Sequence, residues 1–394
     1  MSHPAELADQ ASFDTTLHLR LVFGNGTLSQ LGELASEHGA GKVLLVTDPG
    51  IRAVGHVDRA QASLKAAGLS VAIYDQAKEN PTTECVAECV ELARAEGIDF
   101  IVGLGGGSSM DTAKGCNFLL TNGGEMKDYW GVGKASKPML PLIAIPTTAG
   151  TGSECQSFAL ISDAVTHAKM ACGDPKAMAK VAILDPELTL SQPPRVTACT
   201  GIDAVAHAVE SAVTRKRNDT SQEYSRVAFG LLSESLPRVL ANPDDLEARG
   251  RMLLGAAFAG TAIEHSMLGA AHSAANPLTA HFDVIHGQAV GLMLPHVVRF
   301  NGEDETVAGA YASLVTGTSV ASANGKPATE TLAQALEGFM DAASLPRDLA
   351  ACGVDAAKLE VLSEEAAGQW TASFNPRDIT ATDFSALYQK AFAS

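Results

Sequence analysis

Short apolar runs alternate with helical stretches through the first half of the chain. Lys42–Asp48 (KVLLVTD) and Leu69–Asp75 (LSVAIYD) have the length and β-branched content of buried strands. Residues 58–67 form a helical stretch between them, and residues 82–97 fit a helix that starts at a Thr cap and ends at Gly97. This alternation predicts βαβ units and therefore a parallel sheet.

Two more strands in this half are each followed by a glycine-rich turn. Residues 99–114 (DFIVGLGGGSSMDTAK) indicate a strand, a turn and a helix start, and residues 141–154 (PLIAIPTTAGTGSE) repeat the strand and the turn. Ligands of open α/β sheets bind beyond the carboxyl ends of strands, and a helix N-terminus attracts phosphate. The turns therefore predict a phosphate cradle. A plain strand-to-helix turn remains the alternative, because neither the GxGxxG nor the Walker pattern is present.

The pattern changes from about Val196 onward. Ala, Leu and His recur there at helical spacing, and β-branched runs become rare. Pro193 and Pro194 interrupt any regular element at this point. A chain of 394 residues is also long for a single core. We therefore expect an α/β domain over residues 1–193 and a mostly helical domain over residues 194–394.

Four residues of the second half are candidate metal ligands. Asp203 and His207 are four apart and so share a helix face, and His286 follows His272 by fourteen residues. A carboxylate with three imidazoles suits a divalent transition metal such as Fe²⁺ or Zn²⁺. By itself, an Asp/His pair at this spacing more often lies on a solvated or hydrogen-bonded helix face. Glu210, seven residues after Asp203, is expected on the metal-facing side, in contact with a ligand rather than with the metal.

Composition excludes several classes of partner. The net charge of −17 argues against nucleic acid and against an anionic membrane surface. No apolar run reaches the roughly 20 residues of a membrane span, and the first residues do not resemble a secretory signal. The seven cysteines are scattered and include no CxxC pair, which is typical of a cytoplasmic protein without a disulfide framework.

Four segments together resemble the iron-containing (group III) alcohol dehydrogenase family. They are GGGSxxDxAK, PTTxGTGSE, DAxxHAxE and the two histidines at fourteen-residue spacing. The resemblance implies a dehydroquinate synthase-like fold, with a Rossmann-like NAD-binding domain followed by an all-helical metal-binding domain. It also implies that Fe²⁺, or Zn²⁺, is bound by Asp203, His207, His272 and His286.

The same resemblance implies a set of NAD contacts at the strand ends. They are Asp48, Asn80, Gly105, Gly106, Gly107, Ser108, Asp111, Thr147, Thr148, Thr151, Ser153 and Lys169. The position of Asp48 also suggests a role apart from the resemblance. A carboxylate at a strand end can accept hydrogen bonds from a ribose and would repel a 2′-phosphate. We therefore expect NAD in preference to NADP. An aspartate that merely forms a turn is the alternative.

The chain departs from the family pattern beside the third ligand. Relatives often have a second histidine one turn after it, where this chain has Asn276, and His265 stands where they have an amide. His265 and His272 are seven residues apart, which on one helix puts them on the same face. His265 is thus a candidate for the missing proton relay, with Asn276 as its neighbour in the pocket. A hydrogen-bonded packing histidine is the alternative.

The resemblance implies an NAD(H)-linked alcohol dehydrogenase or aldehyde reductase that transfers a hydride between an alcohol at the metal and the nicotinamide. We expect a small-molecule alcohol or aldehyde as substrate and a cytoplasmic homodimer. Hydroxyacid–oxoacid transhydrogenases and maleylacetate reductases remain alternatives, and a dehydroquinate synthase-like lyase is disfavoured because no Lys/Arg cluster adjoins the ligand segments.

Overall fold

The chain folds into two compact units. The computed structural model describes residues 3–166, 168–320 and 326–392. The first unit, here the sheet unit, comprises Met1–Thr148 and Gly152–Gln192, and the second, the helical unit, comprises Ala149–Thr151 and Pro193–Ser394. The short segment Ala149–Thr151 is therefore grouped with the helical unit, although both of its neighbours belong to the sheet unit.

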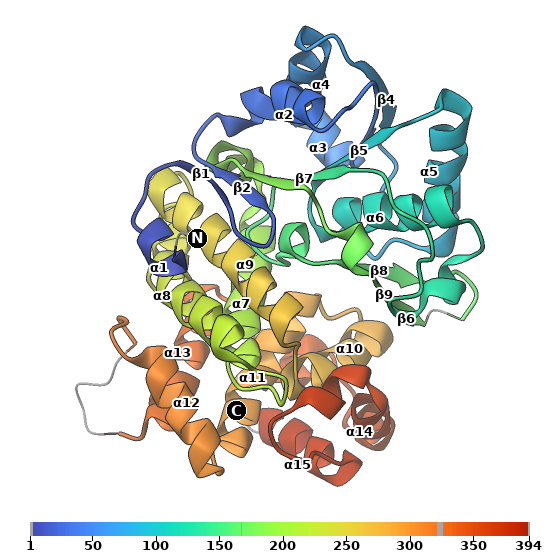
Figure 1. The fold of residues 1–394 in the computed structure, drawn as a ribbon. Helices are drawn as coiled ribbons and strands as arrows, with labels where there is room; N and C mark the ends of the chain where they lie inside the picture. The colour runs from blue at the N-terminus through green and yellow to red at the C-terminus, as the bar shows by residue number, and fades with distance from the viewer. Residues whose placement is uncertain (1–2, 167, 321–325, 393–394) are drawn as a thin grey trace. The chain divides into compact units, whose positions relative to one another are not determined.

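The sheet unit is built on a seven-stranded sheet (Figure 1). Its strand order is β1-β2-β10-β7-β5-β3-β4, and all pairs are parallel except β1 with β2. The strands are β1 (Phe13–Thr16), β2 (Arg20–Phe23), β3 (Lys42–Val46), β4 (Ser70–Tyr74), β5 (Phe100–Gly105), β7 (Leu142–Pro146) and β10 (Val181–Leu184). The central strands β5 and β7 are buried along their whole length, as expected of a parallel sheet covered on both faces.

Helices cover the two faces of this sheet because alternate residues of each strand point to opposite sides. In β3, Val43 and Leu45 pack into one core, while Leu44 and Val46 pack into the other. The helices of the unit are α1 (Pro4–Leu7), α2 (Leu31–Glu37), α3 (Pro49–Ala53), α4 (His56–Ala66), α5 (Thr83–Glu96) and α6 (Gly107–Asn122). The α5 helix begins at its Thr82 cap and ends at Gly97, as the sequence predicts.

A second, three-stranded sheet, in which β6 (Gly131–Val132) precedes the 147–154 turn and β8 (Phe158–Ser162) and β9 (Lys169–Gly173) follow it, was not predicted from the sequence. Its order is β6-β9-β8. The β8 and β9 strands pair antiparallel. A Cβ at residue 173 would overlap the Phe158 ring, so glycine is what allows the pair to close.

After the two prolines, α-helices replace the alternation of strands and helices, as the sequence predicts. The helices of the helical unit are α7 (Pro194–Ser211), α8 (Asp219–Ala241), α9 (Leu246–His265), α10 (Ala270–Phe282), α11 (His286–Asn301), α12 (Glu305–Val315), α13 (Ala328–Ala342), α14 (Leu359–Gly368) and α15 (Ala381–Ala391). The α7 helix is buried on all sides from Gly201 to Ser211, so it is the central helix of the unit. The predicted fold class, a Rossmann-like α/β domain followed by a helical domain, is confirmed.

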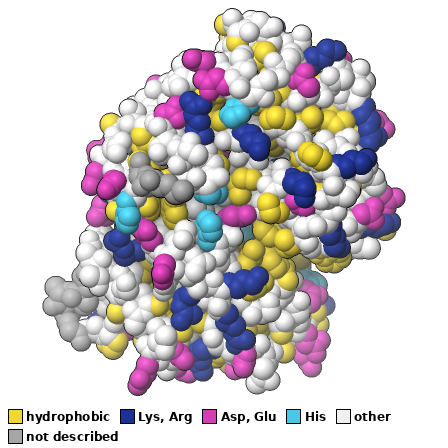
Figure 2. Space-filling view, viewed as in Figure 1, with side chains coloured by type: hydrophobic (Ala, Val, Ile, Leu, Met, Phe, Trp, Pro, Cys, Tyr) yellow, Lys and Arg dark blue, Asp and Glu magenta, His cyan; other side chains and the backbone are white. Residues whose placement is uncertain are grey.

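The surface carries charges of both signs. Lys and Arg side chains are intermingled with Asp and Glu on the face shown in Figure 2. Among the described residues, no helix is both long enough and apolar enough to cross a membrane. All seven cysteines are thiols outside any disulfide, as their scattered positions predict.

Candidate metal centre and nucleotide turns

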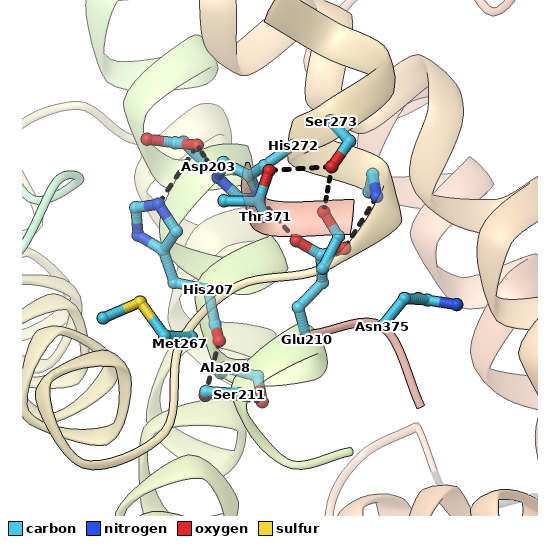
Figure 3. A network of polar contacts seen from close by, with 12 residues as sticks. Asp203, His207, Ala208, Glu210, Ser211, Met267, His272, Ser273, Thr371 and Asn375 are labelled. Atoms are coloured by element: carbon cyan, nitrogen blue, oxygen red, sulfur yellow. Dashed lines mark hydrogen bonds and ion pairs between the residues drawn. The ribbon is translucent and has the colours of Figure 1, made fainter. Parts of the chain in front are cut away.

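Three helices of the helical unit bring the four predicted ligands together (Figure 3). Oδ1 of Asp203 lies 3.4 Å from Nε2 of His207, which is one turn further along α7. It also lies 3.4 Å from Nε2 of His272 on α10 and 3.9 Å from Nε2 of His286, the first residue of α11. Asp203, His207 and His272 are buried, whereas the His286 side chain is 32% exposed and lies at the open side of the cluster.

Close packing of α11 on α7 brings His286 to the cluster. A Cβ at residue 287 would overlap the carbonyl oxygen of Cys199, which lies one turn before Asp203. Gly287 thus lets the start of α11 approach the α7 backbone closely. A larger residue at this position would push His286 away from the carboxylate.

The donor atoms of the cluster fit a divalent metal. Oδ1 of Asp203 and Nε2 of His272 are buried and have no hydrogen-bond partner among the described residues. Buried polar atoms are otherwise almost always paired, so two such atoms facing one point indicate a missing ligand. Tetrahedral ligands at 2.0–2.1 Å from an ion are roughly 3.3–3.4 Å apart, which is close to the two shortest separations here. The Asp203, His207 and His272 donors all lie within 4.8 Å of one another.

Electrostatics within the cluster stabilise a carboxylate among imidazoles. Burial disfavours the charged form of Asp203, but the imidazoles of His207, His286 and His272 outweigh it and hold the pKa of Asp203 well below its usual range. Burial lowers the pKa of His207. Burial also opposes protonation of His272, yet the carboxylates of Glu210 and Asp203 raise the pKa of His272 to about 9. A metal ligand must be a neutral imidazole, so metal binding would release a proton here.

Glu210 orients His272 from the side away from the ligand cluster. Its Oε2 lies 2.5 Å from Nδ1 of His272, and its Oε1 accepts a 2.7 Å hydrogen bond from the backbone N–H of Ala271. A Cβ at Gly269 would come within 3.1 Å of the same carboxylate. Glu210 thus contacts His272, one of the predicted ligands, as expected from the sequence. Such a carboxylate fixes the tautomer of a metal-binding imidazole, here with Nε2 left for the metal.

The expectation that His265 and His272 share a helix face is wrong. The α9 helix ends at His265, and α10 begins at Ala270. Between them Met267 has a φ of 124°, which breaks any helix. The seven-residue period holds only along one continuous helix, so the spacing argument does not apply. The His265 side chain is exposed, and its carbonyl accepts a 2.8 Å hydrogen bond from Nδ2 of Asn218. A proton relay at His265 stays an untested prediction.

Asn276 lies where the sequence places it, on α10 one turn after His272. Its Nδ2 donates a 3.0 Å hydrogen bond to Oε1 of Gln369. This bond holds the amide in place, and an amide cannot relay a proton as an imidazole can. Its role in the pocket stays a prediction.

The two glycine turns begin side by side, because β5 and β7, which they follow, are neighbouring strands. The backbone N–H of Thr147 donates to the carbonyl of Gly105 at 2.9 Å. Gly105 has a φ of 149°, and a Cβ there would overlap Ser109. The α6 helix starts at Gly107, so the N–H groups of Gly107 and Ser108 are in its first turn, where anions bind favourably.

A buried polar network ties these turns together. Ser153 Oγ donates to Oδ1 of Asp111 at 3.0 Å. The Lys114 ammonium is fully buried and donates to Ser153 O at 2.6 Å, to Ser153 Oγ at 2.9 Å and to Phe158 O at 3.0 Å. Burial raises the pKa of Asp111. The sequence motifs did not assign a role to Lys114. Its position three residues after Asp111 on a helix places the two side chains on the same face.

Asp48, which lies beside the glycine turns, is the N-cap residue of α3. Its Oδ1 accepts a 3.0 Å hydrogen bond from the N–H of Ile51 at the start of α3, and its Oδ2 accepts one from Ser109 Oγ at 3.2 Å. Lys169 donates to Oδ1 of Asn80 at 3.5 Å, so these two predicted contacts meet each other. Thr148 lies against Gly106, and Thr151 belongs to the segment grouped with the helical unit.

Comparison with known proteins identifies the family to which the chain belongs. The family model described as iron-containing alcohol dehydrogenase matches residues 19–186, and that of the C-terminal part of the same family matches residues 197–392. The chain belongs to the iron-containing alcohol dehydrogenase family, as the sequence motifs predict.

Individual relatives are similar to this protein along nearly the whole chain. It is 35% identical over 370 residues to the NAD-dependent methanol dehydrogenase of Bacillus methanolicus, which covers 94% of this chain and 97% of that protein. It is 34% identical to long-chain-alcohol dehydrogenase 1 of Geobacillus thermodenitrificans, over 95% of this chain and 97% of that one. A crystal structure of a 1,3-propanediol oxidoreductase matches with a TM-score of 0.90 at 30% identity, covering 97% and 100%.

Proposed function

We propose that the chain interconverts an alcohol and its aldehyde or ketone, with the reacting oxygen at the Asp203 cluster and a nicotinamide cofactor held by the glycine turns. Membership in the family makes it a metal-dependent, NAD-linked alcohol oxidoreductase. The observation that carries the proposal is the convergence of buried, unpartnered donor atoms from Asp203 and His272.

In this proposal Asp203, His207, His272 and His286 hold the metal, which is Fe²⁺ or, as the alternative, Zn²⁺. The bound ion supplies Lewis acidity that favours loss of the alcohol proton. Asp203 contributes the negative charge that makes cation binding favourable, and Glu210 keeps His272 in the ligating tautomer. The partly exposed His286 side chain would leave an approach for substrate at that side of the cluster.

The sheet unit, within the proposed domain of residues 1–193, would bind NAD. Gly105, Gly106, Gly107 and Ser108 offer backbone N–H groups and a hydroxyl at the α6 N-terminus. Thr147 Oγ1 is buried and has no partner among the described residues, so it is a donor available to a ligand. The further proposed NAD contacts are Asp48, Asn80, Asp111, Thr148, Thr151, Ser153 and Lys169.

The proposal also covers the substrate class, the cellular location and the oligomeric state of the protein. Relatives bear the names of methanol and long-chain-alcohol dehydrogenases, so the family does not prescribe substrate size. We propose a small-molecule alcohol or aldehyde of undetermined chain length as substrate, a helical metal-binding domain at residues 194–394, and a cytoplasmic homodimer. The seven cysteines outside any disulfide support a reducing compartment.

The test is metal analysis of protein purified without oxygen, followed by assays of the metal-free, Fe²⁺ and Zn²⁺ forms. We expect one metal per chain, NADH formation from NAD⁺ and a primary alcohol, and loss of that activity on chelation. NAD-linked turnover that survives complete removal of metal would overturn the metal mechanism. NADH formation only when a second oxoacid substrate is supplied would indicate a transhydrogenase instead.

A further inference from the structure

A cavity of about 620 Å³ lies within the helical unit, beside the start of α11. Its walls come from the first turns of α7, residues 282–285, Gln288 on α11, residues 342–346 at the end of α13, and residues 351–352. His286 does not line it. Two residues along a helix are about 200° apart around its axis, so Gln288 and His286 point to nearly opposite sides of α11. The cavity is therefore separate from the metal cluster, and its volume is that of a small-molecule pocket.

One wall of the cavity carries three linked polar side chains. Nη2 of Arg195 lies 3.4 Å from Oε1 of Gln288, and Nε2 of Gln288 donates a 3.1 Å hydrogen bond to Sγ of Cys352. Gln288 is only 5% exposed, and both ends of its amide are engaged in these contacts. The amide oxygen is thus held toward Arg195, and it keeps the guanidinium beside the cavity.

The Arg195 guanidinium has no carboxylate partner among the described residues. Other arginines of the same unit do have one, since Arg299 pairs with Glu330 at 2.8 Å and Arg377 pairs with Glu303 at 2.9 Å. A guanidinium offers five N–H donors in a planar fork that matches the two oxygens of a carboxylate. Arg195 therefore presents a positive charge and free donors at the wall of the cavity.

Most of the other lining side chains are apolar, among them Leu240, Phe282, Val284 and Leu345. One cation beside apolar walls suits a ligand with one anionic group and a hydrocarbon body. Asp283 is the only acidic residue that lines the cavity. Its negative charge disfavours a doubly charged phosphate more than a singly charged carboxylate.

We propose that this cavity binds a small carboxylate with an apolar chain. The carboxylate oxygens accept hydrogen bonds from the Arg195 guanidinium, which Gln288 positions, and the chain lies against Phe282 and Val284. Such a site goes beyond the alcohol–aldehyde reaction, because its residues are on the other side of α11 from the metal cluster. The proposal does not depend on which metal the cluster holds.

The proposal is tested on the whole chain with Cys352 as the reporter. Cys352 lies on the cavity wall and is half-buried, whereas the other six cysteines are buried. The rate at which iodoacetamide, a neutral reagent, alkylates Cys352 is followed by mass spectrometry of the peptide that contains it. Hexanoate should slow this reaction. Hexylammonium, with the same chain and the opposite charge, and inorganic phosphate, which lacks the chain, should need concentrations at least about tenfold higher for the same effect.

Arg195→Met removes the positive charge and keeps an apolar side chain. Because Arg195 is exposed, the fold should be unaffected. The variant should raise the hexanoate concentration for half-maximal protection at least about tenfold, with each variant compared to its own rate without hexanoate. Arg226→Met, at an exposed position of α8, is the matched control and should behave as the parent does.

Hexanoate that fails to protect Cys352 in the parent, or that protects it equally in Arg195→Met, would overturn the proposal. Equal protection by hexylammonium would reveal an apolar cavity that does not recognise a carboxylate. Equal protection by phosphate would reveal a general anion site. Either of these results also contradicts the proposal.

Discussion

Two buried polar clusters, one around Lys114 in the sheet unit and one around Asp203 in the helical unit, are arranged in opposite ways. In the sheet unit the Lys114 ammonium has three oxygen acceptors within 3.0 Å, one for each of its N–H bonds. In the helical unit Oδ1 of Asp203 lies 3.4 Å from Nε2 of His272, which is an ion pair only while His272 is protonated, and neither atom has a hydrogen-bond partner among the described residues. Buried polar groups that all have hydrogen-bond partners stabilise the fold by themselves. Buried polar atoms that face one point without such partners are stabilised when a ligand binds between them. The comparison thus separates a structural network from a binding site.

The first prediction breaks the unsatisfied cluster. His272→Ala removes one metal donor and leaves Glu210 without its partner, and turnover should fall at least about 1,000-fold because metal catalysis is worth several kcal/mol. Metal content should fall with it, while far-UV circular dichroism stays unchanged. His281→Ala, on the same helix but paired with Glu365 at 2.9 Å, is the control and should keep both metal and activity. A fully active, metal-loaded His272→Ala protein would remove this residue from the site.

The second prediction breaks the satisfied network. Lys114→Met leaves Ser153 and Phe158 carbonyls buried without their donor, and removing one partner of a buried charged network costs about 3–5 kcal/mol. The thermal midpoint should fall by roughly 10 °C, with metal content per folded chain unchanged. The exposed Lys65→Met in α4 is the control and should shift the midpoint by less than about 1 °C. Equal midpoints for the two variants would show that Lys114 does not stabilise the turns.

The third prediction concerns Glu154, a buried carboxylic acid of the sheet unit that lies outside the Lys114 hydrogen bonds. Neither of its carboxylate oxygens has a partner among the described residues, and burial raises its pKa from 4.5 to about 7. The group is therefore protonated more readily in the folded chain than in the unfolded one. Its stabilising contribution is complete below about pH 4.5 and is lost as pH rises through about 7. That loss amounts to about 3 kcal/mol.

Glu154→Gln removes this ionisation while it keeps the side-chain shape. The difference in thermal midpoint, variant minus parent, should increase steadily between pH 5 and pH 8. Asp58→Asn, at the exposed start of α4, should give a nearly constant difference over the same range. Parallel curves for parent and Glu154→Gln would mean that Glu154 has a partner when the protein is in solution.

The fourth prediction sharpens the assignment of Asp48. Asp48→Ala should raise kcat/KM for NADP relative to NAD by at least about tenfold, because it removes a negative charge expected to repel the 2′-phosphate. It also removes the α3 cap, which costs about 1 kcal/mol. Thr380→Ala, which removes the cap of α15, should lower stability similarly and leave the cofactor ratio unchanged. An unchanged ratio in Asp48→Ala would leave Asp48 as a cap alone.

The smallest expected effect is at His265. Because a helix break separates His265 from His272 and its side chain is exposed, His265→Asn should change turnover by less than about threefold with metal content constant. A general acid–base relay would lose at least about tenfold, and the pH profile would lose an ionisation in the histidine range. That larger loss would restore the relay and would place His265 near the reacting oxygen despite the break.

Local patterns predicted the elements and the class of chemistry. The Thr82 cap, the Gly97 stop and the alternation in β3 are properties of a few neighbouring residues, so they can be read along the chain. The two glycine turns could be placed together for a similar reason, since each follows a buried parallel strand. The ligand set came from motifs, and Asp203 with His207 also from helical spacing. The β8–β9 hairpin was missed because its short connection contains no Gly, Pro or Asn, and the turn is formed instead by Asp163, whose Oδ1 accepts hydrogen bonds from the N–H groups of Val165 and Thr166.

Tertiary structure alone decided how the side chains meet. The sequence spacing of His265 and His272 indicated one helix face, but the backbone at Met267 and Gly269 breaks the helix and places them on different helices. Lys114 became a network centre only when β8 and the 153 turn supplied its acceptors. Likewise, the 3.4 Å approach of Asp203 to His272 requires α10 to pack beside α7. Such contacts join residues far apart along the chain, so no local pattern encodes them, and burial determines which of them are left without a partner.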